Sequence, residues 1–230
     1  MEHIKERLEE VRYRICQAAQ KTGTRPEDIR LIAVTKTVDI DRINHILNLG
    51  ITDIGENRVQ EILSKYGRVN SAVNWHLIGH LQTNKVKYIV DKTYLIHSLD
   101  SIKLAGELDK AAGKADRILD VLIQVNVSGE DTKYGVLMNG YHEFVKQLEQ
   151  YQNIRVKGLM TIAPYTIDEE EVRPYFRKLR ELYEETKAKL VLGRSMEYLS
   201  MGMTNDYRVA IEEGSNMIRL GTALFGERHK

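Results

Sequence analysis

Hydrophobic positions in the first part of the chain recur at spacings of three and four residues. This repeat over residues 2–21 predicts a helix that packs on one face, which we expect to carry Ile4, Leu8, Val11, Ile15 and Ala18. Cys16 lies in the same amphipathic segment, and we expect it in the core. The chain therefore begins with a helix that needs a partner surface.

The rest of the chain alternates between apolar runs and helical segments. Eight runs have the character of strands, at residues 31–36, 52–57, 75–81, 94–99, 118–128, 154–162, 197–203 and 216–226. Helical patterns begin near Asp39 and near Asn205, and others cover residues 100–113, 140–151 and 174–190. This alternation predicts an α/β fold with a parallel sheet.

Eight such units in 230 residues favour one closed barrel, because a TIM barrel typically takes about 250 residues. We therefore predict a single (β/α)8 TIM barrel with an extra N-terminal helix, as one domain over residues 1–230. A doubly wound open sheet is the alternative.

The charges nearly cancel, with 34 Lys and Arg against 33 Asp and Glu. No overall field favours nucleic acid or an anionic membrane, and no run approaches the roughly 20 apolar residues of a membrane span. The single cysteine cannot form an internal disulfide, which fits a reducing compartment. We expect a cytoplasmic protein without nucleic-acid or membrane partners.

Polar residues stand where several predicted strands end, and sites in barrels gather at those carboxyl ends. The residues found there include Lys36, Glu56, Asn57, His76, His97, Ser200, Arg219, Gly221 and Thr222. The loops after the last two strands read SMGMT and RLGTALFG. Gly202 and Gly221 would let the main chain approach an anion, and Ser200 and Thr222 add hydroxyl donors. Phosphate binding is one interpretation, and tight turns are the other.

Lys36 is either a solvated strand end or a nucleophile. A neutral amine attacks a carbonyl to form a Schiff base, and a lysine, a phosphate cradle and an arginine together indicate pyridoxal 5'-phosphate. Arg219 would then face the pyridine nitrogen, although a salt bridge to a neighbour such as Glu56 is the alternative. A guanidinium has only donors, so it would leave that nitrogen unprotonated and weaken the ring as an electron sink.

His76 and His80 are four residues apart, but the strand context argues against a shared zinc site, and we predict no metal. His76 is better interpreted as a residue beside a ring-shaped ligand, or as a hydrogen-bonded core histidine.

Several runs resemble the pyridoxal phosphate homeostasis protein family over essentially the whole chain. They are VTKT, DIGENRVQE (53–61), WHLIGHLQTNK (75–85), VNVSGEDTKYG, GLMTI (158–162), LSMGMTNDYRVAIEEG (199–214) and IRLGTALFG (218–226). The resemblance implies a fold-type III barrel, similar to the N-terminal domain of bacterial alanine racemase and of eukaryotic ornithine decarboxylase. It also implies a covalent aldimine of pyridoxal phosphate on Lys36, with Ser200, Gly221 and Thr222 at the phosphate. Arg219 would face the pyridine nitrogen, and Asn57 and His76 would lie near the ring.

By the same resemblance, the protein acts in vitamin B6 and amino-acid homeostasis without established turnover, so no catalytic residue is assigned. It would store the cofactor or pass it to pyridoxal phosphate-dependent apo-enzymes in transient contacts, and the lack of a dimerising second domain leads us to expect a monomer. The sequence ends after the eighth unit, where related two-domain enzymes continue into a domain that supplies a second acid or base. A racemase-like enzyme with one base is the alternative function, and a barrel for another phosphorylated metabolite is a third.

Overall fold

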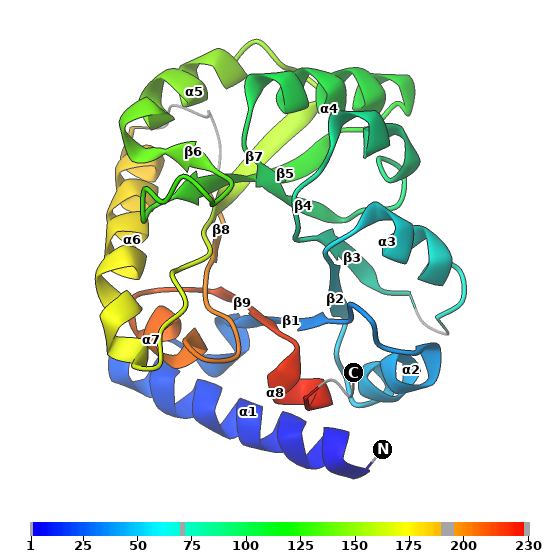
Figure 1. The fold of residues 1–230 in the computed structure, drawn as a ribbon, viewed down its shortest axis with the longest axis vertical. Helices are drawn as coiled ribbons and strands as arrows, with labels where there is room; N and C mark the ends of the chain where they lie inside the picture. The colour runs from blue at the N-terminus through cyan, green and yellow to red at the C-terminus, as the bar shows by residue number, and fades with distance from the viewer. Residues whose placement is uncertain (1, 70–71, 190–195, 228–230) are drawn as a thin grey trace.

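Parallel strands close into a barrel in the computed structural model, which describes residues 2–69, 72–189 and 196–227. Nine strands are hydrogen-bonded in the order β4-β3-β2-β1-β9-β8-β7-β5-β6, and β4 also pairs with β5. Strand β6 pairs only with the carboxyl end of β5, and the other eight strands form the closed ring visible in Figure 1. The bounds are Arg30–Val34 (β1), Asp53–Glu56 (β2), Asn74–Leu77 (β3), Leu95–Leu99 (β4), Leu119–Asn126 (β5), Val136–Leu137 (β6), Ile154–Met160 (β7), Tyr198–Ser200 (β8) and Met217–Leu220 (β9).

Helices surround this ring on the outside (Figure 1). They are Glu2–Thr22 (α1), Ile40–Asn48 (α2), Val59–Lys65 (α3), Ile102–Lys114 (α4), Tyr141–Leu148 (α5), Arg173–Ala188 (α6), Tyr207–Glu212 (α7) and Thr222–Phe225 (α8), with 3-10 turns at Pro26–Asp28, Thr83–Tyr88, Met138–Gly140 and Glu169–Val172. Helix α1 packs against α7 and α8 with the predicted stripe buried. The barrel with an extra N-terminal helix is therefore confirmed, and the pairings β1–β9 and β4–β5 exclude the open sheet.

Several predicted boundaries differ from those observed. Strand β1 ends at Val34, so Lys36 lies in the turn that follows it. The last predicted strand stops at Leu220, and the chain then winds into α8. Helix α6 is seen to Ala188, and position 190, where its end was predicted, lies outside the described residues. Cys16 is partly exposed rather than in the core, because it lies one position past Ile15, off the buried stripe.

Apolar side chains fill two separate regions on the two sides of the strand wall. The larger region lies between the strands and the helices. The smaller one comprises one residue from each of five strands, namely Ile32, Leu95, Leu122, Met160 and Met217. Successive side chains of a strand point to opposite faces, and these five face the barrel interior. The same alternation places four buried polar side chains in the interior, namely His76, His97, Ser200 and Arg219 on β3, β4, β8 and β9. The barrel interior is therefore partly polar.

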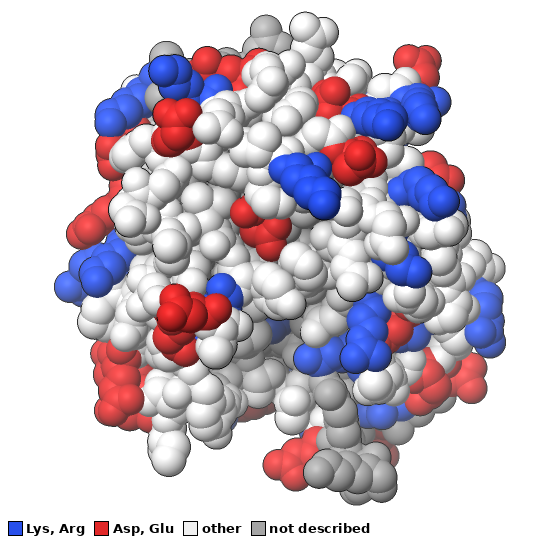
Figure 2. Space-filling model, turned by 45° about the horizontal axis from the view of Figure 1, so that its top comes forward, with Lys and Arg blue, Asp and Glu red and all other residues white. Residues whose placement is uncertain are grey.

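In the described part of the chain, no helix combines the length and the apolar character needed to cross a membrane. The face drawn in Figure 2 carries acidic and basic side chains interspersed with one another. This agrees with the near-zero net charge of +1.

Candidate functional site

A cavity of about 620 Å³ opens where the chain leaves the carboxyl ends of the strands. We call it the upper cavity. It brings together four of the seven predicted site residues, Lys36, Arg219, Gly221 and Thr222. A smaller hollow of about 380 Å³ shares Lys36, Gly221 and Thr222 with it. Residues that are nearly 190 positions apart in the sequence thus meet because β1 and β9 are neighbours.

The other three predicted site residues do not line the upper cavity. Asn57 is partly buried after β2, with its main chain packed against Gly79. His76 and Ser200 are fully buried in the barrel interior. The alternative of a hydrogen-bonded core histidine therefore describes the position of His76, and the predicted contacts of these three residues with a cofactor stay predictions.

The turn that carries Lys36 is held from the helix side of the strand wall. Lys65 Nζ of α3 donates to the carbonyl of Thr35 at 2.8 Å, and the Thr35 hydroxyl donates to Glu56 Oε1 at 2.6 Å. On the other side, the amide of Thr37 donates to Glu61 Oε2 at 3.0 Å. Thr37 has φ of 62°, a conformation that strains a β-branched residue. The residues on both sides of Lys36 are thus fixed by side chains from β2 and α3.

Glu56 and Lys65 form a buried ion pair behind this turn, with 2.7 Å between Nζ and Oε1. Burial raises the pKa of Glu56 to about 7, against the opposing hydrogen bonds from Lys65 and Thr35. Oε2 of Glu56 has no hydrogen-bond partner among the described residues. Desolvation therefore has a larger effect on the pKa of Glu56 than the Lys65 cation has.

Arg219 reaches the upper cavity from the barrel interior and is only 3% exposed. Its NH1 group donates to Ser200 Oγ at 2.6 Å, and its NH2 group donates to the Thr161 carbonyl at 2.8 Å. Burial lowers the pKa of Arg219 to about 10, with Asp206 partly opposing the shift, so the side chain is a cation at neutral pH. The alternative of a salt bridge to Glu56 is wrong, because Glu56 pairs with Lys65 on the opposite face of the strand wall.

The two glycines of the predicted phosphate loops have different roles. Gly202 has φ of 95°, and an added Cβ would lie 2.6 Å from Ala210 Cβ, so this glycine lets the turn pack on α7. At Gly221 an added Cβ would meet only Val34, at 3.5 Å or more. Neither a positive φ nor a close contact of an added Cβ therefore requires glycine at 221.

Thr204 and Asp206 also line the upper cavity, and neither was among the seven predicted site residues. The Thr204 hydroxyl accepts a hydrogen bond from the amide of Ala223 at 3.3 Å, next to the start of α8. Asp206 accepts from the amide of Met203, and helix α7 begins only after it, at Tyr207. The run SMGMT already contained Thr204, whose hydroxyl follows Gly202 by two residues.

His76 and His80 do not approach each other as metal ligands would. His80 is exposed, pairs with Asp100 at 3.1 Å and stacks on Tyr134. Across the described ranges, no group of three or more His, Cys, Asp or Glu side chains is arranged to hold a metal ion.

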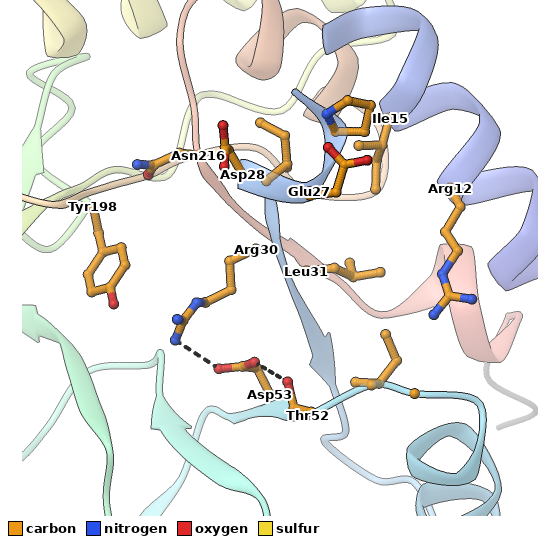
Figure 3. A pocket seen from close by; sticks show the side chains of 14 residues that line it. Arg12, Ile15, Glu27, Asp28, Arg30, Leu31, Thr52, Asp53, Tyr198 and Asn216 are labelled. Carbon is orange, nitrogen blue, oxygen red and sulfur yellow. Dashed lines mark hydrogen bonds and ion pairs between the residues drawn. The ribbon is translucent and has the colours of Figure 1, made fainter. Parts of the chain in front are cut away.

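A second cavity, of about 600 Å³, lies at the opposite end of the barrel and is drawn in Figure 3. We call it the lower cavity. Arg30 points into it and pairs with Asp53 at 3.3 Å, while the Thr52 hydroxyl also donates to Asp53 (Figure 3). It contains none of the predicted site residues, and barrel chemistry is located at the carboxyl ends. The upper cavity is therefore the candidate site.

Comparisons with known proteins agree with this geometry. The family model described as "Alanine racemase, N-terminal domain" matches residues 7–229. A protein of Aquifex aeolicus named "Pyridoxal phosphate homeostasis protein" is 47% identical over 224 residues, 97% of each chain. The structure of PipY from Synechococcus elongatus, described as having PLP bound, is 32% identical and superposes with a TM-score of 0.83, covering 97% of this chain and 100% of that one. Alanine racemase of Corynebacterium glutamicum shares the fold, with a TM-score of 0.68 at 13% identity, and this chain covers 62% of it.

Proposed function

Because the chain belongs to the pyridoxal phosphate homeostasis protein family, built on the alanine racemase N-terminal domain, we propose that it binds pyridoxal 5'-phosphate in the upper cavity. The observation that carries this proposal is the meeting of Lys36, Arg219 and Thr222 around one cavity. Its volume of about 620 Å³ lies within the roughly 300–1,000 Å³ of small-molecule sites.

The lining residues match the three parts of the cofactor. Lys36 would supply the amine for condensation with the aldehyde, a reaction that releases the aldehyde oxygen as water. Gly221, Thr222 and Thr204 surround the start of α8, where the hydroxyls of Thr222 and Thr204 would suit a phosphate, while the Ala223 amide already donates to Thr204. Arg219 has donors beyond the two used by Ser200 and Thr161, and one of them can reach an unprotonated ring nitrogen.

We propose storage and delivery rather than turnover. The bound cofactor supplies an imine and an electron-accepting ring. Arg219 is a donor-only partner, so it favours the unprotonated ring nitrogen, and its charge at neutral pH makes proton transfer to that nitrogen unfavourable. Lys36 would hold the aldehyde and release it by hydrolysis. A monomeric state and contact with apo-enzymes stay predictions.

Borohydride reduction followed by mass spectrometry of tryptic peptides tests the proposal. The protein incubated with pyridoxal phosphate should absorb in the visible and carry the reduced adduct on Lys36. Lys36→Ala should lose both signals, whereas Lys103→Ala, which removes an exposed lysine on α4, should keep them. An unmodified Lys36 peptide in the native protein would refute covalent binding and favour a site for another phosphorylated metabolite.

The alternative function is a racemase-like enzyme that uses Lys36 as its one base. Incubation with a panel of amino acids in deuterated water separates the two functions. Exchange at the α-carbon no faster than with free cofactor supports the storage function, and faster exchange that Lys36→Ala abolishes supports the enzyme.

A further inference from the structure

Five buried side chains form an unbroken row of hydrogen bonds through the barrel interior. His76 Nε2 lies 2.9 Å from Asp53 Oδ1, and His76 Nδ1 lies 3.0 Å from His97 Nε2. His97 Nδ1 lies 3.0 Å from Ser200 Oγ, which accepts from Arg219 at 2.6 Å. The row thus begins at Asp53 in the lower cavity (Figure 3) and ends at Arg219 in the upper cavity.

The row crosses the barrel because its members stand on the inner faces of strands that are not all neighbours. Asp53 and His76 come from the paired strands β2 and β3, and His97 comes from β4. Ser200 and Arg219 come from β8 and β9 on the other side of the ring. The contact between His97 and Ser200 therefore spans the barrel.

The ionised carboxylate of Asp53 at the lower end of the row determines which atoms of the row carry protons. Burial alone would raise the pKa of Asp53, but hydrogen bonds from His76 and Thr52 and the nearby Arg30 hold it below its ordinary value. An ionised carboxylate only accepts, so His76 must carry its proton on Nε2. Burial lowers the pKa of His76 despite the carboxylate, so its Nδ1 is an unprotonated acceptor.

The remaining assignments follow in sequence. His97 must carry its proton on Nε2 in order to donate to His76 Nδ1. Burial, with His76 and Arg219 nearby, lowers the pKa of His97 well below its ordinary value, so its Nδ1 is also an acceptor. The Ser200 hydroxyl must then donate to His97, and its lone pairs accept from Arg219. The opposite direction would require a protonated Asp53.

We infer that Asp53, His76, His97 and Ser200 form a one-way hydrogen-bond relay, in which every proton points away from Arg219 and which positions that guanidinium for the upper cavity. The two histidines and Ser200 are positioning residues. The relay needs no ligand to exist, whereas its effect on pyridoxal phosphate depends on the proposed function. It also directs the Ser200 hydroxyl proton away from the cavity, so Thr204 and Thr222 are the hydroxyls left to face a phosphate.

Nitrogen-15 NMR of the histidine rings in the cofactor-free protein tests the relay directly. His76 can be assigned by its contact with Tyr94, whose ring centroid is 5.5 Å away. Both His76 and His97 should be neutral Nε2–H tautomers at neutral pH. A proton on Nδ1 of either ring at that pH, whether or not Nε2 is also protonated, would overturn the inference.

Ser200→Ala removes the donor to His97 and the acceptor of Arg219. It should produce a mixture of His97 tautomers, shift the absorption maximum of bound cofactor and weaken its binding about tenfold or more, since a hydrogen bond to a charged group contributes about 1.5–3 kcal/mol. Ser200→Thr, which keeps the hydroxyl, should restore the tautomer. Thr186→Val is the matched control, because it removes a buried hydrogen bond to Tyr141 between α5 and α6 and should change neither signal.

The outcomes separate this inference from the proposed function. Two Nε2–H histidines in a protein that binds no pyridoxal phosphate would support the relay and refute the function. Cofactor binding with an Nδ1–H His97, or with unchanged affinity and absorption in Ser200→Ala, would refute the relay and leave the function standing.

Discussion

Glu56→Gln should abolish a loss of stability that the cofactor-free protein undergoes as the pH rises through 7. Glu56 is fully buried beside Lys65, and its Oε1 accepts from Lys65 and Thr35. Gln keeps an oxygen for these donors and has no ionisation. The difference between the variant and the wild type therefore isolates the proton of Glu56.

The magnitude follows from the raised pKa. A change from 4.5 to about 7, at about 1.4 kcal/mol per unit, corresponds to about 3 kcal/mol. Since the folded state binds this proton more tightly than the unfolded state, the stabilisation is fully present below pH 4.5 and is lost as the pH rises through 7. In a chain of this size 1 kcal/mol shifts Tm by about 2–4 °C, so the Tm difference between variant and wild type should grow by about 6–12 °C from pH 4.5 to pH 8.5.

Thermal unfolding followed by circular dichroism over this pH range measures the difference, and Glu61→Gln is the control with the opposite sign. Burial would raise the pKa of Glu61, but its interactions with Glu56, the Thr37 amide and Lys65 lower it. Glu61→Gln should therefore be less stable than the wild type at neutral pH and approach it in acid. A Tm difference for Glu56→Gln that stays flat, or that falls with increasing pH, would show that Lys65 keeps Glu56 ionised and would refute the reasoning.

Two further substitutions test the surroundings of the upper cavity. Lys65→Met leaves Glu56 without its cation and should lower the free energy of unfolding by about 3–5 kcal/mol at pH 8. The loss should be smaller at pH 5, where Glu56 takes up a proton, and equal losses of Tm at both pH values would contradict this. Gly221→Ala should change stability by less than about 1 kcal/mol, because its Cβ meets only Val34 at ordinary contact distance, while weakening the binding of pyridoxal phosphate in a fluorescence titration; a large loss of Tm would instead show that the fold needs this glycine.

The alternation of apolar runs was sufficient to predict the barrel, since each strand buries an outer face against helices and this leaves a regular pattern. Where strands end was harder to predict. The run 216–226 was predicted as one strand, yet the chain turns at Gly221 and buries Leu224 and Phe225 from a short helix. The hydrophobicity of the run indicates that both segments, β9 and α8, are buried, but it does not distinguish a strand from a helix.

The candidate site was predictable where residues follow the strands, as with Lys36, Gly221 and Thr222. The contact of Ser200 with His97 was not predictable, because a strand-end position does not say which way a side chain points. Ser200 faces His97 across the barrel, and only the alternation along β8 and the closure of the ring determine that contact.

Both buried polar networks are arranged behind the upper cavity rather than inside it. The Glu56–Lys65 pair fixes the turn of Lys36 from the helix side of the strand wall, and Ser200 fixes Arg219 from the barrel interior. Apolar residues of similar volume are often at least as stabilising as a buried ion pair, so stability alone does not explain these groups. They do explain how the turn that carries Lys36 and the guanidinium of Arg219 are both held in place beside one cavity, which a ligand bonded to both residues would require.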